Sequence, residues 1–225
     1  MSNQMFNPNK LPEHLKVTTD LIDYEFFIKQ VVDYNLRRLY LGGEIRSVED
    51  DDPTSINESI DELVDEIRRF NREDEGKSRD DRTPIRLFID SPGGDISAGF
   101  KLVDAITTSR TPVYTINESR CYSMAFLVFI CGSKRFSTPK ATFLMHDGVM
   151  FFGNSANKAF ETADFYKSFE EEVVKKHVLR YSAMTGEEYD RVRSKEYYML
   201  PEKAMEHGFL DEVITPENEN CDILY

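Results

Sequence analysis

The sequence predicts an α/β protein in which helices cover a largely parallel β-sheet. Strand and helix patterns alternate densely between residues 85 and 146. This alternation favours a parallel sheet, because parallel strands are joined by helical crossovers. Strands are expected at 39–41, 85–90, 112–117, 134–137 and 141–146, with helices at 95–108 and 123–131.

Four more helices are expected around these elements. An amphipathic helix over 54–70 has its apolar residues at a period of 3.6 and can be capped by Thr54 or Ser55. A long helix over 157–181 has an apolar stripe, typical either of packing against a partner subunit or of ordinary core packing. Near the C-terminus, Thr185 to Glu188 form a capping box. Pro201 and Gly208 mark the start and the end of the last helix.

Length and charge restrict the class of protein. The 225 residues suit one main domain, expected at 36–215 with an acidic helical insertion at about 47–83. An N-terminal segment, 1–35, and a C-terminal tail, 216–225, flank this domain. The net charge of −13 argues against a nucleic-acid partner, because phosphates would be repelled.

Other sequence features set expectations about location and cofactors. There is no apolar run near 18 residues and no signal-peptide core, which predicts a soluble, cytoplasmic protein without a membrane partner. Cys121, Cys131 and Cys221 have neither a disulfide nor a metal-ligand spacing. Reduced thiols, no metal and no cofactor are therefore expected.

Three motifs point to acyl-transfer chemistry. Ser91-Pro92-Gly93-Gly94 follows a strand and precedes a helix, so its backbone N–H groups can face a developing negative charge. Ser123, 32 residues after Ser91, opens an apolar helix, where N–H groups and the helix dipole stabilise anions. His146 ends an apolar strand and is a candidate base.

Each motif has a simpler interpretation when taken alone. The glycines would suit an ordinary turn, Ser123 an N-cap, and His146 a structural role. The other histidines lie in different settings: His14 in the N-terminal segment, His177 on the long helix and His207 beside a helix end. The combination of the three motifs favours a serine-dependent site.

In this order and at these spacings, the motifs resemble the proteolytic subunit of the Clp protease, a self-compartmentalised serine peptidase. The resemblance covers about residues 36–214 and implies the ClpP version of the crotonase-like fold. It implies Ser123 as nucleophile, His146 as general base, and the N–H groups of Gly94 and Met124 as the oxyanion hole. Extended peptide substrate would add a strand at the site, with the implied binding positions Gly93, Asp95, Ile96 and Gly148.

The third catalytic group is implied by the segment Ser194 to Leu200, which matches the family's acid motif with Glu196 in place of the usual aspartate. Asp190 and Asp147 are the competing acids, and a Ser–His dyad is also open. Before the nucleophile, the usual small residues are replaced by Arg120, Cys121 and Tyr122, which would narrow or charge the specificity pocket.

The resemblance also implies partners: a homo-oligomer of heptameric rings stacked in pairs, with docking pockets for an AAA+ unfoldase. Phe88 and Phe136 fit such a pocket, whereas Arg86 and Thr108 stand where apolar or aromatic residues are usual. Peptidase chemistry is therefore better supported than unfoldase binding.

Three functions remain open at this point. The first is ATP-independent peptide-bond hydrolysis by a serine endopeptidase inside an oligomeric chamber. The second is a catalytically silent ring subunit. The third is a crotonase-type acyl-CoA enzyme, which needs no Ser–His pair and which the acidic charge disfavours because CoA phosphates prefer a basic site.

Overall fold

The computed structural model describes residues 33–47, 60–148, 156–217 and 223. The chain separates into two units, Met1–Arg38 and Leu39–Tyr225. In the first unit, the described residues 33–38 include a turn in which Arg37 N–H donates to Tyr34 O at 3.1 Å. The predicted segment 1–35 lies almost wholly outside the described residues, so its boundary stays a prediction. All described site residues belong to the second unit.

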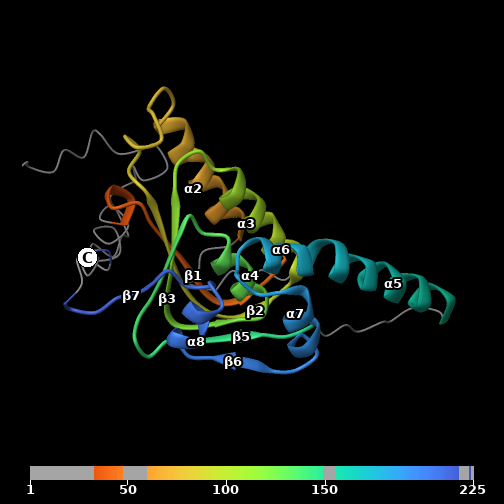
Figure 1. Ribbon diagram of the computed structural model, residues 1–225. Coiled ribbons are helices and arrows are strands. Elements are labelled where there is room, and N and C mark those ends of the chain that lie inside the picture. Colours follow the sequence, from red (N-terminus) through yellow and green to blue (C-terminus); the bar gives the residue numbers. More distant parts are fainter. Residues whose placement is uncertain (1–32, 48–59, 149–155, 218–222, 224–225) are drawn as a thin grey trace, which may run out of the picture. The chain divides into compact units, whose positions relative to one another are not determined.

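One seven-stranded sheet organises the second unit (Figure 1). Its strands are β1 Arg38–Ile45, β2 Ile85–Gly94, β3 Val113–Tyr122, β4 Lys134–Ser137, β5 Thr142–Met145, β6 Tyr197–Met199 and β7 Glu212–Val213. The path β1-β2-β3-β4-β7 is extended by β5, which pairs with β3, and by β6, which pairs with β5. The pairs β2–β3, β3–β4, β3–β5 and β4–β7 are parallel, whereas β5–β6 is antiparallel. The predicted mixed α/β class with a mostly parallel sheet is confirmed.

The helices of this unit are α2 Ile60–Glu73, α3 Ile96–Thr108, α4 Met124–Ile130, α5 Ala156–Phe169, α6 Lys175–Arg180, α7 Gly186–Val192 and α8 Pro201–Glu206. A π-helical segment, η4 Glu170–Val174, joins α5 to α6, so the long predicted helix is present with an irregular middle. The capping box of Thr185 and Glu188 is formed, and Pro201 lies in the first turn of α8. The predicted helix start at Thr54 lies outside the described residues.

Helix α4 forms the centre of the core. All seven of its residues are buried, and it contacts β2, β3 and α3. The rings of Phe126 and Phe129 lie 6.5 and 5.1 Å from that of Phe143 on β5, and Phe126 also meets Phe209 at 4.9 Å. Burying each such ring contributes roughly 1.5–3 kcal/mol. The residue that precedes α4, Ser123, is therefore held by a tightly packed helix.

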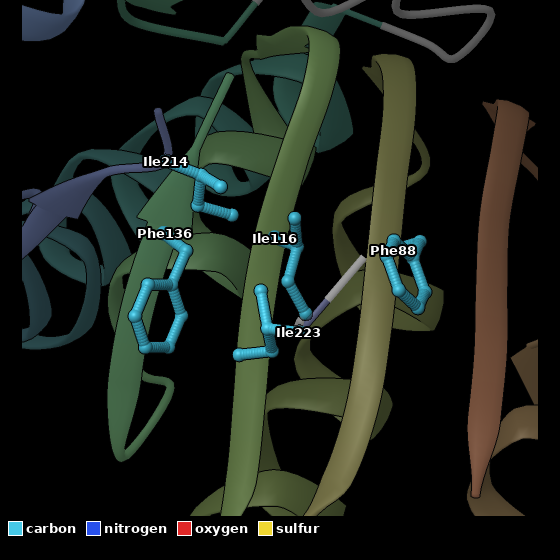
Figure 2. Close-up of a cluster of buried hydrophobic side chains, with 5 residues drawn as sticks. All are labelled: Phe88, Ile116, Phe136, Ile214 and Ile223. Atoms are coloured by element: carbon cyan, nitrogen blue, oxygen red, sulfur yellow. The ribbon is translucent and has the colours of Figure 1, made fainter. Parts of the chain in front are cut away.

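A second apolar cluster lies on one face of the sheet, over strands β2, β3 and β4 (Figure 2). Phe88, Ile116 and Phe136 occupy one register row across β2, β3 and β4. The cluster is completed by Ile214 and by Ile223 near the C-terminus. Tyr40 stacks on Phe88 with ring centroids 5.4 Å apart. This face is distinct from the strand ends that carry the predicted chemistry.

The strands differ from the sequence prediction mainly at their ends. β2 continues through the Ser-Pro-Gly-Gly motif to Gly94, with a register irregularity between Ile89 and Ser91, so the motif is extended chain and not a turn. β3 likewise continues beyond Asn117 to Tyr122. The short strands β6 and β7 were not predicted. They contain only three and two residues, too few for an alternating pattern to be visible.

Candidate active site

The parallel strands bring the predicted catalytic positions to the same edge of the sheet. Ser91 pairs with Cys121, and a Cβ built on Gly93 would lie 2.7 Å from Ser123 Cβ. Tyr122 pairs with Leu144, and Ser123 N–H donates to Leu144 O at 2.9 Å, so the nucleophile candidate lies beside the end of β5, where His146 follows. Gly93, Ser123 and His146 are therefore found where three neighbouring strands end.

Strand β6 adds the fourth position. Met145 pairs with Tyr197 in the antiparallel β5–β6 ladder, so the next residues outward, His146 and Glu196, stand opposite each other. His146 Nδ1 lies 2.9 Å from Glu196 Oε1, a hydrogen-bond distance. The imidazole side chain is 19% exposed and the carboxylate side chain is 60% exposed. A carboxylate at Nδ1 favours the tautomer that leaves Nε2 able to accept a proton.

Ser123 has an unusual backbone conformation, with φ 54° and ψ −124°. Non-glycine residues at positive φ are strained, and such strain is concentrated at functional sites. The strand-to-helix turn between β3 and α4 has the form of a nucleophile elbow, in which a serine hydroxyl is exposed at a sharp turn. The side chain makes no capping hydrogen bond to α4. The N-cap interpretation of Ser123 therefore lacks its defining contact.

Two N–H groups beside Ser123 are suited to bind an oxyanion. Met124 is the first residue of α4, where backbone N–H groups have no partner within the helix. Gly93 has φ 93°, and a Cβ at this residue would lie 2.9 Å from Met124 N. Gly93 N–H itself donates to Ser91 Oγ at 3.1 Å. The resemblance assigns the glycine donor to Gly94, which follows Gly93 at the end of β2.

The predicted peptide-binding positions differ in whether their backbone N–H and C=O groups already have hydrogen-bond partners. Asp95 caps α3 through its side chain, its N–H donates to Ile45 O at 2.8 Å, and its carbonyl accepts Gly99 N–H. In this conformation Asp95 has no unused backbone group, so it suits anchoring of α3 better than substrate binding. Ile96 opens α3, and Gly148 is exposed at the end of the described segment after β5.

The competing acids lie in other contacts. Asp190 is 2.8 Å from Lys175 Nζ, and this hydrogen bond holds the pKa of Asp190 below its usual value. Asp147 is exposed, and its N–H donates to Arg193 O at 2.7 Å. Of the three candidate acids, Glu196 is the one placed at hydrogen-bond distance from the His146 ring.

The other described histidines have structural surroundings. His177 Nε2 lies 2.9 Å from Leu127 O, and burial lowers its pKa. His207 Nε2 lies 2.8 Å from Tyr197 Oη, and burial lowers its pKa as well. His14 lies outside the described residues. Neither described ring has a hydrogen bond to Ser123 or Glu196 among the described residues.

The described cysteines cannot serve as nucleophiles. Cys121 and Cys131 are free and buried. Burial raises the pKa of both thiols, so neither forms the reactive thiolate at neutral pH. Cys221 lies outside the described residues. Ser123 is therefore the stronger candidate at the start of α4.

Aromatic and charged side chains line the approach to Ser123. Tyr122 Oη lies 2.8 Å from Thr142 Oγ1, and its ring meets Tyr198 edge-on at 5.8 Å. Arg120 Nε lies 2.9 Å from Asp90 Oδ1, so its charge is paired. Tyr198, 60% exposed, was not singled out from the sequence. The feature that distinguishes Tyr198 is the alternating exposure along β6, where it is exposed between the less exposed Tyr197 and Met199.

The positions linked to unfoldase docking do not form one surface patch. Phe88 and Phe136 lie in the apolar cluster of Figure 2. Thr108 is at the end of α3, on a cavity between α2 and α3, where its hydroxyl donates to Asp104 O. Arg86 is half-buried on β2 and is not without a partner.

In residues 33–47, 60–148, 156–217 and 223, no group of three or more His, Cys, Asp or Glu side chains is arranged to hold a metal ion. Over the same part of the chain, no helix combines the length and the apolar character needed to cross a membrane.

Comparison with known proteins gives the family. A chain of Dehalococcoides mccartyi named ATP-dependent Clp protease proteolytic subunit is 30% identical over 172 residues, covering 74% of this chain and 82% of that protein. The corresponding subunit 2 of Mycolicibacterium paratuberculosis is 31% identical over 147 residues, covering 61% and 70%. The subunit of Deinococcus radiodurans is 27% identical over 146 residues, covering 64% and 71%. The family model described as Clp protease matches residues 76–217, and the chain therefore belongs to the Clp protease family, as a ClpP-like serine-type peptidase.

Proposed function

We propose that this chain is a serine endopeptidase that uses Ser123 as nucleophile, His146 as general base and Glu196 as the acid of a triad. The N–H groups of Gly94 and Met124 are the proposed oxyanion hole. The observation that carries the proposal is the 2.9 Å contact between His146 Nδ1 and Glu196 Oε1, beside a strained Ser123. A structural histidine needs neither feature.

The proposed reaction begins with attack of Ser123 Oγ on the peptide carbonyl. His146 Nε2 takes the hydroxyl proton, and Glu196 stabilises the imidazolium that forms. The negative charge on the carbonyl oxygen is bound by the two N–H groups. His146 then gives the proton to the leaving amine, and water hydrolyses the acyl-enzyme by the same steps.

Peptide binding is proposed to involve backbone pairing at Gly93, Gly94 and Ile96 and at the segment that begins at Gly148. An extended peptide can hydrogen-bond there as an additional strand. The edge-to-face pair of Tyr122 and Tyr198 supports contact with a substrate side chain, because both rings lie next to catalytic positions. Tyr122 is one of the residues that replace the small residues expected before the nucleophile, so small substrate side chains are favoured next to the cleaved bond.

Clp protease family members are oligomeric proteolytic complexes that act on peptides. For this chain we propose a homo-oligomeric chamber of heptameric rings stacked in pairs. The support is α5, where Phe160 and Phe165 are 71% and 61% exposed. Exposed aromatic side chains on one helix are costly in water and suit contact with a second copy. Hydrolysis of short peptides is proposed to need neither ATP nor an unfoldase, and the proposed location is the cytoplasm.

Covalent labelling tests the nucleophile. A fluorophosphonate probe should label the native chain and not Ser123→Ala, and the variant should lose about three orders of magnitude in peptide hydrolysis with assembly intact. Ser168→Ala, at an exposed serine of α5, is the matched control and should label normally. Hydrolysis by Ser123→Ala at the native rate would contradict the proposal. Absence of labelling and hydrolysis in the native chain would instead indicate a silent ring subunit.

A further inference from the structure

The segment between α7 and β6 carries the proposed acid and begins at Arg193. We call residues 193–196 the acid loop. Arg193 O accepts the N–H of Asp147 at 2.7 Å, and Asp147 directly follows His146. The same short segment therefore holds the backbone next to the proposed base and presents the carboxylate of Glu196 three residues later.

The side chain of Arg193 is fixed by carboxylates on two elements. Its Nη1 lies 2.5 Å from Glu171 Oε1 and 4.0 Å from Glu170 Oε1, and its Nε lies 3.6 Å from Asp190 Oδ1. Lys175 Nζ lies 3.2 Å from Glu171 Oε2 and 2.8 Å from Asp190. We call these five residues the charge clamp. It joins the long helix to the start of the acid loop.

The π-helical segment η4 is the part of the long helix that faces the acid loop. A π-helical turn adds a residue to the helical register and often occurs at functional positions. Glu170 and Glu171 open this segment, and Lys175 follows its end. Hydrogen bonds from Lys175 and Arg193 hold the pKa of Glu171 below its usual value. Tyr189 on α7 also donates its hydroxyl hydrogen bond to Glu170.

Glu196 depends on this arrangement because its carboxylate has little other support. Within the described part of the chain, His146 is the one side-chain hydrogen-bond partner of that carboxylate. With 60% of the side chain exposed, packing does not hold it in place. Its position must therefore come from the backbone of the acid loop. A single ion pair at a surface contributes little, but a network of several charges around one guanidinium can hold a loop.

Given the proposed triad, on which this inference rests, we propose that Arg193 is a positioning residue that holds Glu196 and His146 in register by anchoring the acid loop to the long helix. Its guanidinium anchors the loop to Glu171, and its carbonyl holds the backbone after His146. Loss of the guanidinium should allow the loop to move. The Glu196–His146 contact would then be made for only part of the time.

The test uses the assembled protein and a short neutral peptide, with kcat and KM measured separately. Arg193→Met should lower kcat by about tenfold or more with little change in KM. Arg193→Lys should recover part of the rate. Arg191→Met, at an exposed arginine on α7, is the matched control and should behave as the native protein.

A double-mutant cycle separates positioning from a general structural effect. If Arg193 acts through Glu196, then Arg193→Met combined with Glu196→Gln should be no slower than Glu196→Gln alone. Additive losses in the double variant, or a rise in KM with unchanged kcat in Arg193→Met, would overturn the inference. Glu171→Gln weakens the clamp from the other side and gives the same comparison if Arg193→Met does not fold. A fully active Glu196→Gln would instead contradict the proposed triad itself.

Discussion

Replacing Gly93 with alanine tests whether the close approach of β2 to the start of α4 forms the site. A Cβ at residue 93 would lie 2.6 Å from Tyr122 O, 2.7 Å from Ser123 Cβ and 2.9 Å from Met124 N. Two of these atoms belong to the backbone, and the third belongs to the proposed nucleophile. None is the end of a flexible side chain, so the strands themselves must move apart.

The expected magnitude follows from two separate effects. The left-handed φ of 93° at this residue costs a non-glycine residue about 1–2 kcal/mol of folding free energy. In addition, Tyr122 O must retreat by about 0.8 Å to reach an ordinary contact in a close-packed interior. A displacement of roughly this size at reacting groups can lower the rate by about 10²-fold. We therefore expect Gly93→Ala to lose about 10²-fold or more in kcat.

Gly76→Ala is the matched control for the backbone effect. Gly76 has φ 84°, and nothing lies within 4 Å of a Cβ built there. It should lose stability by a similar amount and keep its activity. Thermal unfolding measures the first quantity, and peptide hydrolysis with fluorophosphonate labelling measures the second. If Gly93→Ala hydrolyses peptide as fast as Gly76→Ala, the proposed position of the oxyanion hole is wrong.

Three further predictions concern the acid, the assembly and the response to pH. Glu196→Gln should lower kcat by about 10²–10⁴-fold with KM nearly constant, whereas Asp147→Asn should keep a kcat close to that of the native protein. The reverse result would identify Asp147, and not Glu196, as the acid of the triad. Phe160→Glu with Phe165→Glu should dissociate the oligomer in light scattering, whereas Lys158→Glu on the same helix should not; unchanged mass would exclude α5 from the interface. Lys175 lowers the pKa of Asp190 in the folded chain, so this stabilisation is complete above the ordinary carboxylate pKa and is lost as pH falls through the lowered value. The Tm of Lys175→Met should therefore fall by less than the Tm of the native protein when the pH is lowered from about 6 to about 3. An equal fall in both proteins would contradict a pH-dependent contribution from the Lys175–Asp190 pair.

The sequence predicted the elements whose signals are local. The strand Lys134–Ser137 and the helix start at Asp95 are as expected, because alternation, caps and helical period need only neighbouring residues. The extension of β2 through Gly94 was missed, since Pro-Gly-Gly is typical of turns. Here the two glycines instead allow a close approach, with Ile45 O within 2.1 Å of a Cβ built on Gly94. A long-range contact of this kind leaves no local pattern.

The residues of the candidate site could be predicted only where they belong to the family motifs. Ser123, His146 and Glu196 follow from those motifs, and the roles assigned to them stay proposals. The charge clamp could not be predicted, because Glu171 and Arg193 are separated by α6, α7 and the loop between them, and both resemble ordinary surface charges in sequence. The π-helical segment that lies opposite α7 also has no distinctive composition. Both depend on tertiary packing.

The two halves of the proposed site are held in different ways, and this difference determines how each responds to change. Gly93 lies in β2, and Ser123 is held between β3 and the fully buried helix α4. Alterations there must displace closely packed atoms and should lower the rate strongly. Glu196 lies in the acid loop just before β6, and its side chain is 60% exposed. Its contribution depends on charges that water and salt can screen, so alterations of the acid loop should reduce the rate without removing the chemistry.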